Sequence, residues 1–433
     1  MSIFKKVVRK VAMVLALFYV SSSPSYAERT VKEFRIPSSD GIATISGQVD
    51  SPELGCKDPC ISLIISGGVF FDRDGYMGSL VRMPEGTSFD SLSIYRALSN
   101  ELTKRGIRVV RYDQRGVVGN PRTCIRGQIV SGDKYSAKCL LPNVRRTIHQ
   151  ESMIDDLQAV LNYVKAHILK PNEKIGIIGF SEGARVAIPI VLSPKENVSL
   201  FVLVGAVLTS QLENTKWQRI DRVFGWLERA DENNDRLTTN DEIISAHRSW
   251  LGEYIATPEP FFSPKGAWDL TAGGDAEKWL KQLFLDFKKM ADEAPDGEHI
   301  SGSIGDLPNI TIASAKWLKE NFTDASRVAE LKSANLSMLF AYGEKDNLVS
   351  VPKSVALYNS LFSNLKDSKL LIVPNAGHSL EIKSSDPAIQ VGAGIKQLAV
   401  NISELSKRSS ESRKSKRAAT SFAESGPRKE GHR

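Results

Sequence analysis

Short apolar runs alternate along the chain with longer segments in which apolar residues recur every three or four positions. Continuous apolar runs are typical of strands buried on both faces, and the wider spacing is typical of amphipathic helices. The runs predict strands at 31–36, 43–49, 61–65, 107–112, 174–178, 200–207, 337–342 and 369–373. The spacing predicts helices at 92–104, 151–168, from 182 onward, at 351–361 and at 388–405. This alternation predicts an α/β fold, a mostly parallel sheet with helices on both faces.

The first 27 residues stand outside this alternation. Four basic residues between positions 5 and 10 precede an apolar run at 11–20, which is too short to span a bilayer. The tripeptide Ser25-Tyr26-Ala27 is of the small-x-small type at which signal peptides are cleaved. The pattern predicts a signal peptide cleaved near Ala27 and a periplasmic or secreted mature protein. A retained N-terminal anchor is the alternative.

Composition agrees with a globular protein, because 41% of the residues are apolar and 25% are charged. The net charge is +7, but it is concentrated at the two ends. The first 27 residues contribute +4 and residues 407–433 contribute +6, which leaves −3 on residues 28–406. This distribution gives no reason to expect a nucleic-acid partner.

The C-terminal segment, residues 407–433, consists mainly of Ser, Lys, Arg, Glu and Gly, with Phe422 as its one aromatic residue. Such a segment cannot bury enough apolar surface to offset the entropy lost on ordering, so we expect a disordered tail. Its basic residues allow weak contact with an anionic surface. A simple solvated tail is the alternative.

Export would make the four cysteines candidates for disulfides. Local pairing, Cys56 with Cys60 and Cys124 with Cys139, is the favoured connectivity because each pair brackets a short polar loop. Free thiols are the alternative. We do not expect a zinc site built from all four, since neither pair has the C-x2-C spacing.

The segment Gly179-Phe180-Ser181-Glu182-Gly183 follows one predicted strand and opens an apolar helix. This is the strand–turn–helix context of a nucleophile elbow, a sharp turn that needs small flanking residues and raises the serine hydroxyl above the sheet edge. Ser181 is therefore the candidate nucleophile. A plain glycine-containing turn is the alternative.

Two further polar residues follow predicted strands. Asp346 lies after the strand at 337–342, and His378 lies after the strand at 369–373. The histidine would take the Ser181 proton and return it to the leaving group, and the aspartate would orient the histidine. Either residue alone would pass for an ordinary turn residue. The order Ser, Asp, His, each after its own strand, is that of α/β-hydrolases.

An oxyanion hole needs two backbone N–H donors. The N–H of Glu182 lies at the start of the predicted helix, where the helix dipole favours negative charge. The segment Ser66-Gly67-Gly68 ends the strand at 61–65, where the second donor is expected. We expect the Gly68 N–H to serve, with Val69 as the next choice.

Two segments and the elbow carry a resemblance to a known family. Residues 66–75, SGGVFFDRDG, resemble the S-G-S-G-x-x-D-R-D-G signature of a bacterial branch of α/β-hydrolases, described as esterases or as serine aminopeptidase and acylaminoacyl-peptidase-like enzymes. Residues 105–116, RGIRVVRYDQRG, are similar to a second segment of that branch. The resemblance covers about 60–210 and 335–405. It implies the fold and the triad but not the substrate.

The chain departs from that branch at three places. The branch has G-H-S-E-G-G at the elbow, whereas this chain has Phe180 in place of the histidine and Ala184 in place of the last glycine. It also has Val118-Gly119-Asn120 where the branch tends to have G-K-S. The Phe180 change bears on the floor of the pocket.

Residues 211–330 separate two predicted core strands by far more than a direct crossover needs. The pattern is helical, so we expect a helical cap that shapes the pocket, inserted between core segments 28–210 and 331–406. All six tryptophans lie in it: Trp217, Trp226, Trp250, Trp268, Trp279 and Trp317. We expect most of them to form the cap's own core and one or two to face the site.

Within the cap, Asp231, Asn233, Asp235 and Glu242 stand at positions 1, 3, 5 and 12 of an EF-hand calcium loop. Arg236 replaces the usual glycine at position 6, and the apolar Leu237 comes one position early. The pattern predicts either a structural calcium site or a polar turn between two helices.

Taken together, the sequence predicts an exported serine hydrolase that cleaves small carboxylic esters through an acyl-enzyme and needs no cofactor for catalysis. A serine peptidase uses the same acyl chemistry and is the alternative. A thioesterase or lactonase would share the mechanism. A rival of another class is a non-catalytic binding protein on a hydrolase fold.

Overall fold

A computed structural model describes residues 29–56, 60–69, 72–75, 93–118, 140–247, 258–304, 307–334, 336–383 and 389–424. Its centre is an eight-stranded sheet in the order β1-β2-β4-β3-β5-β6-β11-β12. The strands are β1 (Thr30–Pro37), β2 (Thr44–Ser51), β3 (Ile61–Ser66), β4 (Arg108–Tyr112), β5 (Lys174–Phe180), β6 (Val198–Val204), β11 (Ser337–Gly343) and β12 (Ser368–Val373). Strands β1, β2 and β4 pair antiparallel and all other neighbours pair parallel. The predicted α/β fold is thereby confirmed.

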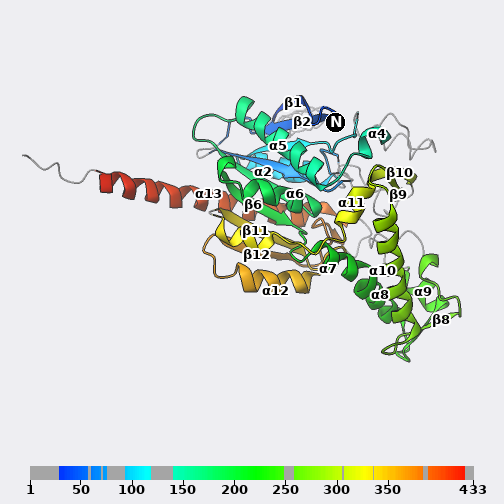
Figure 1. The fold of residues 1–433 in the computed structure, drawn as a ribbon. Helices are drawn as coiled ribbons and strands as arrows, with labels where there is room; N and C mark the ends of the chain where they lie inside the picture. Colours follow the sequence, from blue (N-terminus) through cyan, green and yellow to red (C-terminus); the bar gives the residue numbers. More distant parts are fainter. Residues whose placement is uncertain are drawn as a thin grey trace, which may run out of the picture.

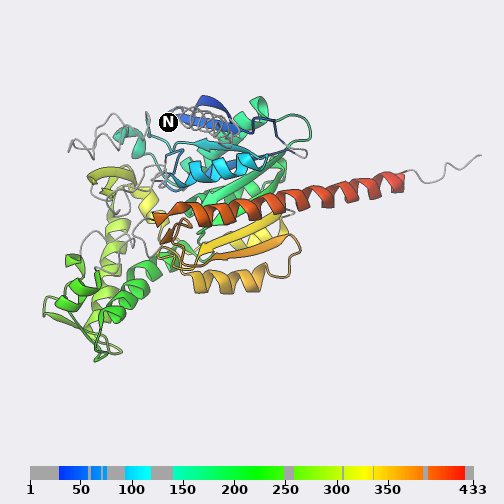
Figure 2. The same ribbon diagram turned by 180° about the vertical axis from the view of Figure 1, so that it is seen from behind.

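Helices cover both faces of the sheet (Figure 1, Figure 2). Residues of α2 (Ile94–Lys104) and α13 (Val391–Glu424) share one apolar cluster with strand residues such as Leu63. Residues of α5 (Gln150–His167), α6 (Glu182–Val191) and α12 (Val351–Leu361) share the other cluster, to which Ile64 contributes. Successive residues of a strand point to opposite faces. Strand β3, which is buried at every position, therefore has a mostly apolar sequence, ISLIIS.

The insertion, residues 211–330, lies to one side of this core (Figure 1). Its helices are α7 (Gln211–Lys216), α8 (Arg222–Ala230), α9 (Asn240–His247), α10 (Asp275–Glu293) and α11 (Ala315–Glu320). It also contains two small two-stranded antiparallel sheets that the helical prediction omits, β7 (Leu237–Thr239) with β8 (Ala267–Asp269), and β9 (His299–Ile304) with β10 (Leu307–Ser314). Three-residue strands such as β7 and β8 are too short to give a periodic sequence signal.

Most of the described tryptophans build the insertion's own core. Trp226 and Trp268 are buried there, and Trp268 stacks on Trp279 with ring centroids 4.5 Å apart. Trp226 meets Phe261 edge-on at 5.8 Å. Trp250 lies outside the described residues.

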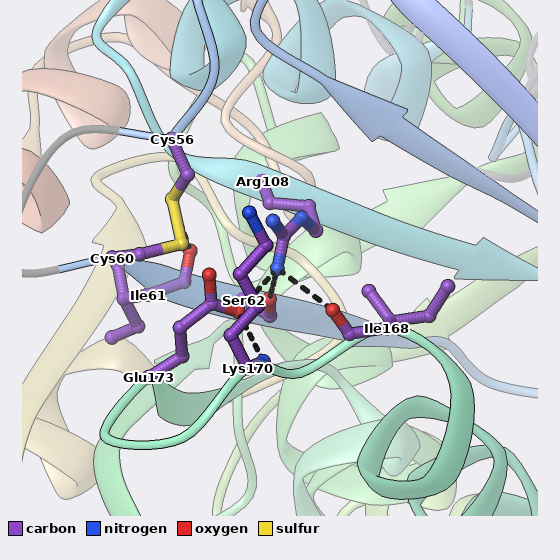
Figure 3. The surroundings of a disulfide bond; sticks show 8 residues. All are labelled: Cys56, Cys60, Ile61, Ser62, Arg108, Ile168, Lys170 and Glu173. Atoms are coloured by element: carbon purple, nitrogen blue, oxygen red, sulfur yellow. Dashed lines mark hydrogen bonds and ion pairs between the residues drawn. A yellow bond between two sulfur atoms is a disulfide. The ribbon is translucent and has the colours of Figure 1, made fainter.

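The amino ends of the parallel strands are held by covalent and ionic links (Figure 3). Cys56 and Cys60 form a disulfide just before β3, as the sequence predicts. Beside it, Arg108 at the start of β4 donates to Glu173 and to Ser62, at 2.7 Å and 3.1 Å. Cys124 and Cys139, the other predicted pair, lie outside the described residues.

The predicted disordered tail differs from the structure over residues 407–424, where the backbone of α13 continues as helix to Glu424. The helix projects beyond the core (Figure 2). Residues 407–424 contain no glycine or proline, and the first of either comes at Gly426 and Pro427. The segment therefore has few apolar residues to pack against the core, but it also has no residue that ends a helix, so the helix can continue. In the part of the chain that the structure describes, no helix is long and apolar enough to cross a membrane.

Candidate active site

Ser181 stands between β5 and α6 with φ 53° and ψ −121°, a backbone conformation that few non-glycine residues adopt. The glycines on either side make this turn sterically feasible. A Cβ on Gly179 would lie 2.3 Å from the Cα of Ala184, and one on Gly183 would lie 2.1 Å from the carbonyl oxygen of Ser66. The turn thus has the tight geometry of a nucleophile elbow.

His378 and Asp346 form a buried pair after β12 and β11. The Nδ1 atom of His378 lies 3.0 Å and 2.9 Å from the two carboxylate oxygens of Asp346. The histidine side chain is 6% exposed and the aspartate side chain is fully buried. Asp346 also accepts the N–H groups of Leu348 and Val349, which fix its orientation.

The loop that carries His378 is held by a residue that sequence reasoning missed. Glu381 accepts the N–H of Ser379 with its carboxylate at 2.8 Å and the N–H of Gly377 with its carbonyl at 2.7 Å. A Cβ on Gly377 would lie 2.1 Å from the Glu381 carboxylate, so a larger residue there would displace that carboxylate. No sequence pattern distinguishes Glu381 from any other loop acid.

Burial and charge act in opposite directions on His378. Burial alone would lower the pKa of the imidazole, but the Asp346 carboxylate, with a smaller contribution from Glu381, raises that pKa above its ordinary value. Burial raises the pKa of Glu381 as well. The Asp346–His378 pair therefore stabilises the imidazolium, the form that a base takes after accepting a proton.

Ser181 and His378 lie on either side of the end of β6. The N–H of Ser181 donates to the carbonyl of Val204 at 2.7 Å. The next residue, Gly205, has φ 55°, and a Cβ there would lie 2.9 Å from the His378 ring. Within the described residues no hydrogen bond joins the Ser181 hydroxyl to His378. Contacts between nucleophile and base are often long without substrate.

The N–H groups of Gly68 and Glu182, which are expected to bind an oxyanion, differ from the Val69 N–H in their hydrogen bonding. Among the described residues, neither the Gly68 N–H nor the Glu182 N–H has an acceptor. The Val69 N–H donates to the carboxylate of Glu182 at 3.3 Å. The structure therefore favours Gly68 over Val69 as the free donor.

The Glu182 side chain links three parts of the molecule, which the sequence did not indicate. Besides Val69, it accepts the indole N–H of Trp317 at 2.6 Å and the guanidinium of Arg185 at 2.8 Å. Trp317 belongs to α11 of the insertion. It is thus a tryptophan of the insertion that contacts the elbow. Trp317 and Glu182 are too far apart in the sequence for a local pattern to predict this contact.

Phe180 stands where the family-like branch has histidine, and its side chain is buried in the core. It is 2% exposed and packs against Tyr95 of α2 with ring centroids 4.8 Å apart. As the last residue of β5, it points to the apolar face beneath the elbow. The phenyl ring therefore extends the core under Ser181.

The predicted calcium ligands all take part in hydrogen bonds within the protein. Both carboxylate oxygens of Asp231 accept backbone N–H groups, from Asp235 and Arg236. The Glu242 carboxylate accepts the N–H and hydroxyl of Thr239 at the start of α9. The described residues contain no group of three His, Cys, Asp or Glu side chains arranged to hold a metal ion. The Asn233 side-chain oxygen accepts the backbone N–H of Asp235 in the same turn. Calcium binding stays a prediction.

A sequence model of the family described as alpha/beta hydrolase fold matches residues 84–383, more than half of the chain. The chain therefore belongs to the α/β-hydrolase family. The more specific bacterial branch stays an expectation from the motifs. No curated protein matches the sequence significantly.

Several solved structures align along most of the chain. An esterase from Pyrococcus furiosus is 16% identical, with a TM-score of 0.43 over 90% of this chain and 94% of that one. A thermophilic esterase from Thermogutta terrifontis is 13% identical, with a TM-score of 0.44 over 87% and 99%. The alpha/beta hydrolase GrgF from Penicillium sp. sh18 is 12% identical, with a TM-score of 0.45 over 88% and 99%. Family membership rests on the family model.

Proposed function

We propose that the protein is a serine hydrolase that cleaves carboxylic esters through an acyl-enzyme. The observation that carries the proposal is the buried Asp346–His378 pair, which lies beside the end of β6 next to a serine in elbow conformation. A buried aspartate bonded to histidine Nδ1 leaves Nε2 as the atom that exchanges protons.

In the proposed reaction, the Ser181 Oγ bonds to the ester carbonyl carbon while its proton passes to His378 Nε2. The carbonyl oxygen becomes an oxyanion that accepts from the N–H groups of Gly68 and Glu182. Collapse breaks the bond to the alcohol oxygen, which takes the proton from His378. Water then attacks the acyl-enzyme, gives one proton to His378, and releases the acid while Ser181 regains its proton.

We also propose that the mature protein is exported. The basic and apolar pattern of residues 1–27 and the Cys56–Cys60 disulfide support this proposal, because disulfides persist in oxidising compartments. Mass spectrometry of the protein from its envelope or medium should find a chain that begins near Glu28. A chain that retains residues 1–27 would contradict it.

The test of the catalytic proposal compares the mature protein with Ser181→Ala on nitrophenyl esters of short and medium acyl chains and on aminoacyl and N-acyl-aminoacyl anilides. We expect ester turnover in the native protein and a loss of at least about 10⁴-fold in Ser181→Ala. Ser193→Ala, at the far end of α6, is the matched control and should keep full activity.

Three other outcomes would contradict parts of the catalytic proposal. Turnover of anilides that requires Ser181 would replace the ester proposal by a peptidase. Ester turnover that survives in Ser181→Ala would overturn the nucleophile. Failure of a fluorophosphonate to label Ser181 would favour a binding protein on a hydrolase fold.

A further inference from the structure

The peptide unit between Gly67 and Gly68 is held by a buried side chain. Gln114, which is 3% exposed, donates from Nε2 to the carbonyl oxygen of Gly67 at 3.0 Å. A carbonyl oxygen only accepts hydrogen bonds, so the amide nitrogen of Gln114 must face it. The direction of this peptide unit is therefore set by Gln114.

The same contact determines where the Gly68 N–H points. In a trans peptide the C=O and N–H of one unit point in opposite directions. Strand β3 lies between β4 and β5 in the sheet, Gln114 follows β4, and Ser181 follows β5. Since Gln114 draws the Gly67 carbonyl toward the β4 side, the Gly68 N–H is directed toward the β5 side, where Ser181 stands.

We infer that Gln114 is a positioning residue that aims the Gly68 N–H at the oxyanion, an inference that rests on the proposed function. Gln114 does not touch the reacting atoms. It acts through the Gly67–Gly68 peptide, which without that contact would be free to rotate and turn its N–H away from Ser181.

Two neighbouring contacts hold the rest of the oxyanion loop, residues 67–69. Arg145, which is 1% exposed, donates to the Val69 carbonyl at 2.6 Å, and the Glu182 carboxylate accepts the Val69 N–H. Neither contact involves the peptide unit that contains the Gly68 N–H. Of the three, the Gln114 contact is therefore the one expected to govern transition-state stabilisation.

The first test is Gln114→Met, which keeps the length of the side chain and removes the donor. We expect kcat to fall about 10- to 100-fold with KM within about twofold, because an oxyanion donor acts only in the transition state. Labelling of Ser181 by a fluorophosphonate should slow in parallel, since its phosphoryl oxygen uses the same donors.

The matched control is Ser199→Ala. Ser199 is buried and donates to the carbonyl of Ile175 at 2.9 Å. The two residues lie at the amino ends of β6 and β5, away from Ser181. This control removes a buried hydrogen bond of the same kind and should lower thermal stability while leaving kcat unchanged. An unchanged kcat in Gln114→Met, or a change in KM alone, would overturn the inference.

The second test is Gln114→Glu, which keeps the shape of the side chain and carries the experiment if Gln114→Met does not fold. A buried glutamic acid has a raised pKa, and its protonated form can donate to the Gly67 carbonyl. We expect activity near that of the native protein while this group is protonated and a new fall in kcat as pH rises. A residue with a merely structural role would add no such alkaline limb.

These outcomes separate the inference from the proposed function. If the native protein neither turns over esters nor labels at Ser181, the proposed function fails. If the native protein is active and both Gln114 variants match it in kcat at every pH, only the positioning role fails.

Discussion

The carboxyl ends and the amino ends of the parallel strands carry opposite kinds of structure. At the carboxyl ends, Ser181, Gly205 and Leu380 have positive φ angles, and a histidine and two acids are buried together. At the amino ends, a disulfide, the Arg108–Glu173 pair and the Ser199 hydroxyl tie neighbouring segments together. The amino ends also have positive φ angles, but at Asn172 and Asn197, and asparagine adopts this conformation more readily than serine or leucine. There Arg108 lowers the pKa of Glu173 against the effect of burial. The carboxyl ends therefore hold the less common backbone conformations, and the amino ends hold links that favour the folded state.

Mutations at the two ends of the strands should therefore affect different properties of the protein, activity at one end and stability at the other. Strain and buried charge persist only where surrounding structure holds them in place. Substitutions at the carboxyl edge should therefore change rates, and substitutions at the amino edge should change unfolding free energy.

Among the tests of this comparison, the largest effect is expected for Asp346→Asn, which keeps the shape of the side chain but removes its charge. Without the carboxylate the imidazolium loses its partner, and kcat should fall about 10²- to 10⁴-fold. Steady-state kinetics on the best ester would measure this loss. Glu344→Gln is the control, since Glu344 lies in the same loop and accepts the Asn375 N–H instead. Equal activity of both variants would contradict the pair's proposed role.

At the other edge, replacing both Cys56 and Cys60 by serine should lower the unfolding free energy by about 2 kcal/mol, because a short crosslinked loop loses its constraint on the unfolded chain. Denaturant unfolding would measure the shift, and kcat should not change. A kcat loss in the folded double variant would show that the two edges are not independent.

A smaller stability effect is expected at the elbow itself. Ser181→Gly should be more stable than Ser181→Ala by about 1 kcal/mol, because glycine adopts positive φ without strain. The control pair is Ser193→Gly and Ser193→Ala, at φ −78°, where alanine should be the more stable. The same order at both positions would mean that Ser181 carries no strain.

The pH profile gives the smallest change. Protonated His378 cannot accept the Ser181 proton, and its pKa is raised by Asp346 against the effect of burial. The acid limb of kcat/KM should therefore lie above the ordinary histidine pKa of about 6.5. Glu381→Gln should move this limb to lower pH, since it removes a nearby acid. A limb below 6.5 in the native protein would contradict the assignment.

The core and the order of Ser181, Asp346 and His378 could be predicted because they depend on local patterns. An apolar run gives a strand, and parallel strands place their following loops at one edge. The contacts of Glu182 with Trp317 and of Gln114 with Gly67 could not, since each joins residues far apart in sequence.

The insertion leaves the core after β6 and returns before β11, and these two strands are paired neighbours in the sheet. Because β6 and β11 run parallel, the chain has to cross from the carboxyl end of the sheet to its amino end between them, yet the two ends of the insertion lie side by side. The N–H of Leu212 donates to the carbonyl of Thr323 at 3.0 Å, and the Ser326 hydroxyl donates to the Leu208 carbonyl at 3.4 Å. None of the eight strands of the main sheet comes from the insertion. A different segment could therefore replace this one in a related protein while all eight strands of the main sheet stayed unchanged. Such a replacement would still need a donor in the place of Trp317, whose indole N–H bonds to Glu182 of the core.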